Sequence, residues 1–182
     1  DYTGYFRCHF FFFFGLAIFV KKGISIIEEG EVFVYKEKGY FSQQEFGDHS
    51  RNIQYIHVET KEGPRTIINF HGLWDKTGKG DTENRILQSE NILQFIKTLS
   101  NPCILCGDFN LLPETQSIQI FERQGLRNLI REYNIQSTRT SLYQKSVRFA
   151  DYVFVNKEIK IQNFEVLPEE VSDHAALLLE CE

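Results

Sequence analysis

The chain has 182 residues, of which 42% are hydrophobic and 25% charged, and its formal net charge is −5. This composition excludes an intrinsically disordered chain and supplies enough apolar side chains for a sizeable core. The negative charge argues against a strong non-specific nucleic-acid binder, because only a local basic patch would then hold phosphate. We expect residues 1–182 to form a single domain, since no Pro/Ser/Gly-rich stretch divides them.

Strand patterns dominate the first half of the chain. Runs rich in Val, Ile, Phe and Tyr alternate with Gly23, Gly30 and a Gly63-Pro64 turn, and they predict strands at residues 15–22, 31–37, 52–60 and 65–71. The apolar run at 10–20 is shorter than the roughly 20 residues that span a bilayer, so we predict a buried strand preceded by an aromatic-rich loop. The consecutive phenylalanines at 10–14 would be an aggregation hazard if exposed.

Helical patterns occupy the middle of the chain. Asp81 and Thr82 are candidate N-caps of a helix that runs to about Leu99, with Glu83 in its first turn. Further helical patterns at 115–123 and 126–133 flank Gly125, a helix terminator, and strands are predicted at 103–106, 149–155, 159–167 and 175–180. Strands on both sides of central helices predict an α/β (α+β) fold with sheets of mixed pairing covered by helices.

Cys103 and Cys106 form a C-x-x-C pair, which suits a redox centre or half of a zinc site. No second Cys/His pair follows at ligand spacing, and residues three apart on a strand point to opposite faces. We therefore expect small core thiols. Nothing else indicates disulfides, so a reducing, cytoplasmic compartment is the default expectation.

Polar residues that can carry chemistry lie where the predicted strands end. Asp108 and Asn110 follow the 103–106 strand two residues apart, so on an extended segment they share a face. A carboxylate beside an amide suits a hard cation or an attacking water. Taken alone, however, a Gly-Asp turn is more often a satisfied Asx-type bend.

Three further motifs are similar in kind. Asp173 and His174 precede the apolar strand at 175–180 and offer a metal ligand and a proton-transfer group, although a capped turn with a solvated histidine explains them equally well. His71 ends the 65–71 strand, where a lone histidine is usually a structural hydrogen-bonding group. Asp151 opens a strand that otherwise looks buried, and a buried carboxylate needs a partner such as an imidazole N–H.

These motifs, in this order, resemble the endonuclease/exonuclease/phosphatase (DNase-I-like) superfamily. The resemblance rests on Gly-Asp-Phe-Asn at 107–110, Asp-Tyr-Val-Phe-Val at 151–155 and Ser-Asp-His at 172–174. It extends to Gly-Leu-Ala-Ile-Phe-Val at 15–20 and Asn-Phe-His at 69–71, and so covers nearly the whole chain. The fold it implies is a four-layer sandwich of two mixed sheets flanked by helices.

The resemblance also implies an activity, the hydrolysis of phosphate esters with Mg²⁺ or Mn²⁺. Asp108 would align and deprotonate the water, and Asn110 would hold it or a phosphoryl oxygen. His174, oriented by Asp151, would contact the phosphate, and His71 would donate a hydrogen bond or proton from the opposite side. The implied metal ligands are Asp173, Asp108 and Asn110, whose oxygens suit hard cations.

Two features depart from the family pattern. Family members begin with a strand carrying Asn and a strand carrying a metal-binding Glu, and neither precedes the strand at 15–22. We therefore expect an N-terminal truncation that removes the first strands of the fold, or a segment supplied by another chain, and in either case impaired or abolished turnover of these 182 residues alone. In addition, the spacing of Arg148 to Asp151 and the loop 111–115 are less like the abasic-site endonuclease branch than like phosphodiesterases, deadenylases and lipid-phosphate hydrolases.

The substrate class follows only in outline: a phosphate ester of a nucleic acid, a nucleotide or a lipid head group. Asn69, Trp74, Arg85 and Arg139 are candidate substrate contacts, Trp74 by stacking and the arginines as phosphate clamps. For each arginine a solvated surface position is the commoner alternative. The competing function is a catalytically impaired binding or scaffold module of the same fold, and a redox or zinc protein using Cys103 and Cys106 is the weaker third.

Overall fold

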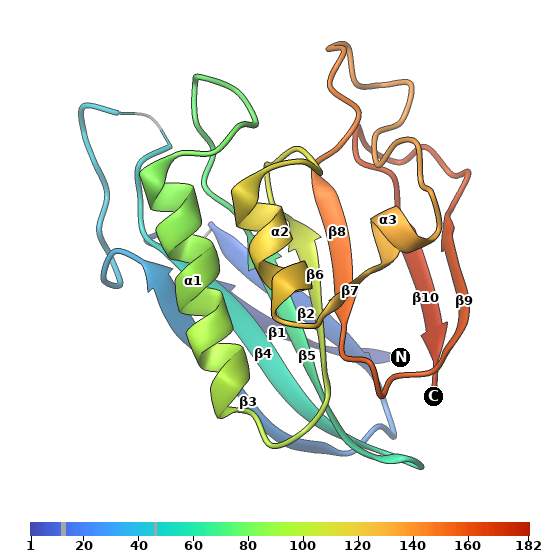
Figure 1. Cartoon of the computed structure of the whole chain (residues 1–182). Coiled ribbons are helices and arrows are strands. Elements are labelled where there is room, and N and C mark those ends of the chain that lie inside the picture. The colour runs from blue at the N-terminus through green and yellow to red at the C-terminus, as the bar shows by residue number, and fades with distance from the viewer. Residues whose placement is uncertain (12–13, 46) are drawn as a thin grey trace.

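A six-stranded mixed sheet, in the strand order β3-β4-β5-β6-β8-β7, forms the centre of the molecule. Figure 1 shows it in a computed structural model that describes residues 1–11, 14–45 and 47–182. Helices α1 and α2 cover one face of the sheet, and the short helix α3 lies beside β7 and β8. The bounds are β3 (Ile26–Tyr35), β4 (Arg51–Thr60), β5 (Gly63–His71), α1 (Glu83–Thr98), β6 (Cys103–Asp108), α2 (Gln116–Arg123), β7 (Arg127–Asn128), α3 (Leu129–Glu132) and β8 (Asp151–Val155).

Two antiparallel strand pairs stand outside the central sheet. The pair β1 (Tyr2–Cys8) and β2 (Gly15–Lys21) packs on β4 and β5, where Val20, Ile56 and Val58 form a small core. The pair β9 (Ile161–Val166) and β10 (Leu177–Cys181) lies beside β6 and β8. The predicted mixed α/β class is confirmed. Helices cover one side of the central sheet, one strand pair packs on β4 and β5, and the other lies beside β6 and β8.

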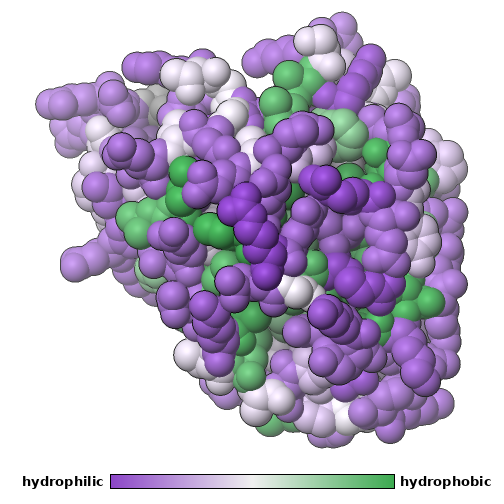
Figure 2. Space-filling model, viewed as in Figure 1, coloured by the Kyte–Doolittle hydropathy of each residue, from purple (hydrophilic) through white to green (hydrophobic). Residues whose placement is uncertain are grey.

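Aromatic rings fill the main core between the central sheet and the helices. Phe109 makes edge-on contacts with Phe70, Phe121 and Tyr152, with ring centroids 5.0, 5.8 and 5.4 Å apart. The hydroxyl of the fully buried Tyr152 donates to the backbone oxygen of Leu111 at 2.9 Å, so its polar end is satisfied. These contacts fix the loop after β6, which starts with Phe109, against the sheet. The outer helical face is largely hydrophilic, with hydrophobic patches between polar side chains (Figure 2).

Most predicted strands are present, with longer or shifted bounds. The strand predicted at 31–37 begins already at Ile26, because Gly30 does not interrupt it: a Cβ there would lie 2.6 Å from the hydroxyl oxygen of Tyr55, which packs across from it. Strand β1 was not predicted. It forms because residues 2–8 pair with β2 in register, a long-range partner that the local sequence pattern does not reveal.

The ends of helix α1 differ in one detail from the prediction. Thr82 caps α1, and its hydroxyl accepts from the backbone N–H of Arg85 at 3.3 Å. Asp81, the other candidate cap, instead accepts from the backbone N–H groups of Gln116 and Ser117 and thereby caps α2. Two adjacent residues, Asp81 and Thr82, thus cap the N-termini of α2 and α1 and hold these two helix ends together.

The buried face of α1 is partly polar. Arg85 and Gln88 are each 2% exposed, and Gln88 accepts from the backbone N–H of Leu73 at 3.1 Å. Both side chains lie beneath the loop that joins β5 to α1, so the first turns of α1 support this loop as well as the core.

Three remaining expectations concern membranes, thiols and the phenylalanine run. No helix in the described part of the chain is long and apolar enough to cross a membrane. Cys103 is buried and Cys106 half-buried, neither forms a disulfide, and burial raises the pKa of their thiols to about 12 and about 11. Of the run at 10–14, residues 12 and 13 lie outside the described residues.

Candidate active site

Strand register brings three of the predicted residues to one edge of the central sheet. Strands β5 and β6 are parallel and end together, with His71 paired to Asp108. Strand β8 runs antiparallel to β6 and begins where β6 ends, with Asp151 paired to Asp108. His71, Asp108 and Asp151 therefore lie side by side on neighbouring strands, although 80 residues separate the first from the last.

His174 joins this row from the other end of the chain. An isolated bridge to Arg139 holds its backbone, and its N–H donates to the hydroxyl of Ser172 at 3.0 Å. Its Nδ1 lies 2.9 Å from both carboxylate oxygens of Asp151. The hydrogen bond to Asp151 raises the pKa of His174 above its usual value, against the opposing effect of burial. With Nδ1 bound to Asp151, Nε2 is the nitrogen left for chemistry.

Two imidazoles converge on one carboxylate oxygen. Oδ2 of Asp108 lies 3.7 Å from Nε2 of His174 and 3.9 Å from Nε2 of His71. Desolvation by the surrounding walls, together with the nearby charge of Arg51, lowers the pKa of His71 well below its usual value. His71 is thus neutral near pH 7, whereas His174 gains a proton more readily.

The other oxygen of Asp108 is held by the backbone. Its Oδ1 accepts from the backbone N–H of Asn110 at 2.8 Å, in a turn where Asn110 has φ of 55°. The sequence predicted that Asp108 and Asn110 share one extended segment, but the strand ends at Asp108. Asn110 instead reaches the site through a left-handed turn. Gly107 makes the approach possible, since at φ 140° a Cβ would lie 1.9 Å from the Phe70 carbonyl oxygen.

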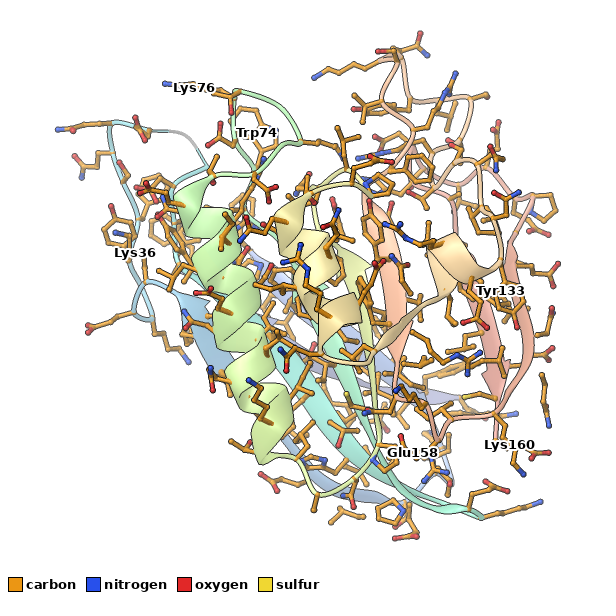
Figure 3. All side chains as sticks on the ribbon, viewed as in Figure 1. Lys36, Trp74, Lys76, Tyr133, Glu158 and Lys160 are labelled. Carbon is orange, nitrogen blue, oxygen red and sulfur yellow. The ribbon has the colours of Figure 1, made fainter. Side chains whose placement is uncertain are left out.

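A cavity of about 790 Å³ opens above this row. Besides His71 and His174, the predicted residues in its lining are Asp108, Asn110, Trp74, Arg139 and Asp173. Its walls include the loops after β3, after β5 and after α3, which stand together at the upper edge of Figure 1. Figure 3 shows Trp74 on the second of these loops, above the start of α1.

Cationic side chains line the same cavity although the chain is acidic overall. Arg51, Lys79 and Arg139 each have a buried nitrogen without a hydrogen-bond partner among the described residues: Nε in both arginines and Nζ in the lysine. Burial lowers the pKa of Lys79 to about 8 and that of Arg51 to about 10. Arg139 also donates from Nη1 to Asp173 at 2.9 Å and stacks 4.2 Å from the ring centre of Tyr143. Such unsatisfied donors are suited to an anionic ligand.

Two predicted substrate contacts lie elsewhere. The side chain of Asn69 donates to the backbone oxygen of Ala17 at 3.1 Å and is outside the cavity lining. Arg85 donates to the backbone oxygens of Leu73, Gly78 and Gly80. Its guanidinium therefore organises the loop after β5, because these hydrogen bonds all go to that loop.

Sequence reasoning did not single out Arg51 and Lys79. Neither belongs to a motif, and each reaches the site only through the fold. The local signal at Lys79 was a loop with glycines on both sides, Gly78 and Gly80, which lets the backbone turn and direct one long side chain inward. No comparable signal marks Arg51, the first residue of β4.

The oxygen-rich side chains fit a hard divalent cation. Among the described residues, Asp108, Asp151 and His174 form a group whose ligand atoms lie within 4.8 Å of one another. Asp151 is already bound to His174, so Asp108 is the member best placed to hold an ion, with Asn110 beside it. Carboxylate and amide oxygens of this kind suit a hard divalent cation that keeps several water or phosphate oxygens as ligands.

Comparison with known proteins places the chain in context. Residues 4–174 match the model of the Endonuclease/Exonuclease/phosphatase family. No curated protein matches the sequence significantly. Among solved structures, a mannosyl-6-phosphatase of Bacteroides thetaiotaomicron is 20% identical with a TM-score of 0.78, and the alignment covers 100% of this chain and 76% of that one.

Two eukaryotic structures are also similar. D. rerio TDP2, complexed with a single-strand DNA product, is 16% identical with a TM-score of 0.70, covering 98% of this chain and 76% of that one. The human Nocturnin catalytic domain, with a bound sulfate anion, is 16% identical with a TM-score of 0.64, covering 98% and 72%. At these identities the likeness establishes a shared fold.

Proposed function

The chain belongs to the endonuclease/exonuclease/phosphatase family, and from that premise we propose that it is a divalent-metal-dependent hydrolase of phosphate esters acting at Asp108 and His174. The family and its solved relatives support phosphate-ester hydrolysis in general. The observation that carries the proposal is the convergence of two imidazole Nε2 atoms, 3.7 and 3.9 Å away, on one oxygen of Asp108.

The phosphoryl group would bind between the two imidazoles. His174, with its pKa raised by Asp151, donates from a protonated Nε2 to a phosphoryl oxygen. Lys79, Arg51 and Arg139 lie in the same lining and offset the negative charge that grows on the phosphoryl oxygens. His71 stays neutral and offers one N–H on the opposite side, where a leaving alcohol needs a hydrogen bond.

Asp108 would act on the attacking water. Its Oδ1 is held by the N–H of Asn110, so Oδ2 has a fixed direction toward the cavity and toward both histidines. A carboxylate with one oxygen restrained can align a water and accept its proton without first reorienting. Asp151 contributes through His174, because it fixes the tautomer and the orientation of that ring.

A divalent ion fits the proposal as the remaining component. Asp108, with Asn110, would hold it, and Asp173 is a further ligand that the family resemblance implies. When bound, such an ion neutralises charge on the phosphate and polarises it toward attack. Mg²⁺ and Mn²⁺ are the ions that oxygen donors favour.

The test is hydrolysis of bis-4-nitrophenyl phosphate and 4-nitrophenyl phosphate with Mg²⁺, with Mn²⁺ and with chelator. We expect metal-stimulated turnover that falls by about 10²- to 10⁴-fold in Asp108→Ala and in His174→Ala, the range typical of general acid–base groups. His57→Ala is the matched control, since His57 hydrogen-bonds Thr66 on the sheet and is not in the cavity lining.

Circular dichroism of each variant separates lost chemistry from lost folding. Folded wild-type protein that shows no metal-stimulated hydrolysis of either ester would overturn the proposal and favour the binding or scaffold module. Equal activity in wild type and in both site variants would locate the reaction somewhere else in the molecule.

A further inference from the structure

Among the described residues, four phenylalanines from two distant segments form an aromatic cluster, which we call the aromatic wall: Phe10, Phe11, Phe14 and Phe41. The ring of Phe10 stacks on Phe14 and on Phe41, with centroids 5.4 and 5.1 Å apart and interplanar angles of 10° and 15°. Phe11 packs 4.9 Å from Phe10 and 5.6 Å from Phe41. The connection after β1 and the connection after β3 thus meet through their side chains.

The aromatic wall lines the same continuous cavity as His71, Asp108 and His174. Two histidines link them: His49 lies 4.1 Å from the Phe10 ring and 5.8 Å from His9, which in turn lies 6.0 Å from His71. Burial lowers the pKa of His9 to about 3 and that of His49 to about 4, so both linking rings are uncharged near pH 7. A ligand that extends from the phosphate site past these rings meets progressively less polar surface.

The wall leaves much aromatic surface exposed. Phe11, Phe14 and Phe41 are 48%, 53% and 39% exposed, and Trp74, in the same lining, is 46% exposed. Contiguous apolar surface of this kind in a soluble domain usually marks a binding site. Its continuity with charged phosphate-binding groups identifies a ligand with one anionic end and one apolar end.

We propose that the substrate is a phosphate ester whose alcohol carries an extended apolar group, and that the aromatic wall binds that group. This rests on the proposed function for the phosphate end of the cavity. A sugar or other polyhydroxyl alcohol needs hydrogen-bond partners, since burying its hydroxyls unpaired is costly. Nδ1 of His49, whose ring lies 4.1 Å from that of Phe10, is already 2.9 Å from the backbone oxygen of Ser50.

The volume of the cavity agrees with a substrate of this size. About 790 Å³ is within the range of pockets that enclose drug-sized ligands and far exceeds what a phosphate group fills. Each methylene that leaves water for the wall should strengthen binding by about two- to fourfold. The same chemistry occurs in a free amphiphilic ester and in a lipid within a bilayer, so an experiment must separate the two.

Alkylphosphonates test the inference without turnover, because their P–C bond is not hydrolysed. Trp74 is the only tryptophan of the sequence and lines the cavity, so its fluorescence reports binding directly, with calorimetry as the independent measure of Kd. For wild-type protein we expect octylphosphonate, below its micelle concentration, to bind at least 30-fold more tightly than methylphosphonate. Phe14→Ser and Phe41→Ser should each reduce that preference at least fivefold and leave methylphosphonate binding unchanged.

Phe19→Ser is the matched control, because Phe19 is 70% exposed on β2 and does not line the cavity. It should behave as wild type. Vesicles of phosphatidylcholine with and without phosphatidic acid provide the second arm of the experiment. If the protein binds octylphosphonate and also binds vesicles only when they contain phosphatidic acid, the substrate is a bilayer lipid. If it binds octylphosphonate but not the vesicles, the substrate is a free ester.

The outcomes that overturn the inference are distinct from failure of the proposed function. If octylphosphonate binds no more tightly than methylphosphonate while nitrophenyl esters are hydrolysed, the apolar subsite is wrong and the hydrolase stands. If neither phosphonate binds and no ester is hydrolysed, both are wrong. Vesicle binding that requires Phe14 and Phe41 without any binding of monomeric octylphosphonate would make the wall a membrane-contact surface instead.

Discussion

Replacing Arg85 tests whether this residue supports a loop or contacts substrate. Its guanidinium donates to the Leu73 carbonyl at 3.2 and 3.0 Å, to Gly78 at 2.8 Å and to Gly80 at 2.6 Å. In Arg85→Met the aliphatic stem stays and all of these hydrogen bonds disappear. The loop that they hold carries Trp74 and Lys79, which are both in the cavity lining.

The expected loss of stability follows from the carbonyls that lose their donor. At about 1 kcal/mol for each of the three acceptors, Arg85→Met should lower the free energy of unfolding by about 3 kcal/mol. For a domain of this size that corresponds to a fall in Tm of roughly 6–12 °C. Urea denaturation and thermal melting followed by circular dichroism measure both quantities.

The control is Arg123→Met, because Arg123 is exposed at the end of α2 and its side chain hydrogen-bonds Gln119 one turn earlier on the same helix. It should change stability by less than about 0.5 kcal/mol. A normal Tm for Arg85→Met combined with a large rise in KM would refute this reasoning. It would restore Arg85 as the phosphate clamp that the sequence suggested.

Two further predictions concern ionisable groups. Burial lowers the pKa of Lys79 from 10.5 to about 8, so between these values the unfolded chain binds more protons than the folded one and the Lys79 contribution to stability rises with pH. Urea titrations should therefore give Lys79→Met a higher free energy of unfolding than wild type below pH 8. This difference should narrow between pH 8 and 10.5, and a difference that stays constant with pH would contradict the prediction. For Cys103 and Cys106, pKa values raised to about 12 and about 11 by burial predict no reaction with a thiol reagent at pH 8 until urea unfolds the chain. Cys181 is exposed, so it should react in the folded protein, although partial burial also raises the pKa of its thiol and slows the reaction. Rapid modification of both Cys103 and Cys106, or a stoichiometric zinc ion, would revive the redox or zinc interpretation.

The sequence predicted the site best where strands end in polar motifs. Asp108 and His71 close two strands, and the apolar run before each of them already indicated where the chain leaves the core. The partnership of Asp151 with an imidazole followed from the cost of burying a carboxylate alone, and the structure has that contact with His174.

Side chains outside motifs were beyond prediction because their roles depend on tertiary contacts. Arg85 looked like a surface cation at the start of a helix, but the loop after β5 folds over it and buries it to 2% exposure. Conversely, Arg51 has no distinguishing neighbours in sequence and Lys79 has only two flanking glycines, so the packing of the loops and strands is what brings both side chains to the cavity. The aromatic wall also needs Phe41, which lies 31 positions after Phe10.

The most direct test of the account is a crystal structure with Mn²⁺ and methylphosphonate, with the metal located by its anomalous scattering. The account predicts an Mn²⁺ peak at direct coordination distance from the carboxylate of Asp108, and a phosphonate between His71 and His174 in contact with at least one of the cavity cations. A phosphonate bound at another surface, or a metal peak remote from Asp108, would contradict it.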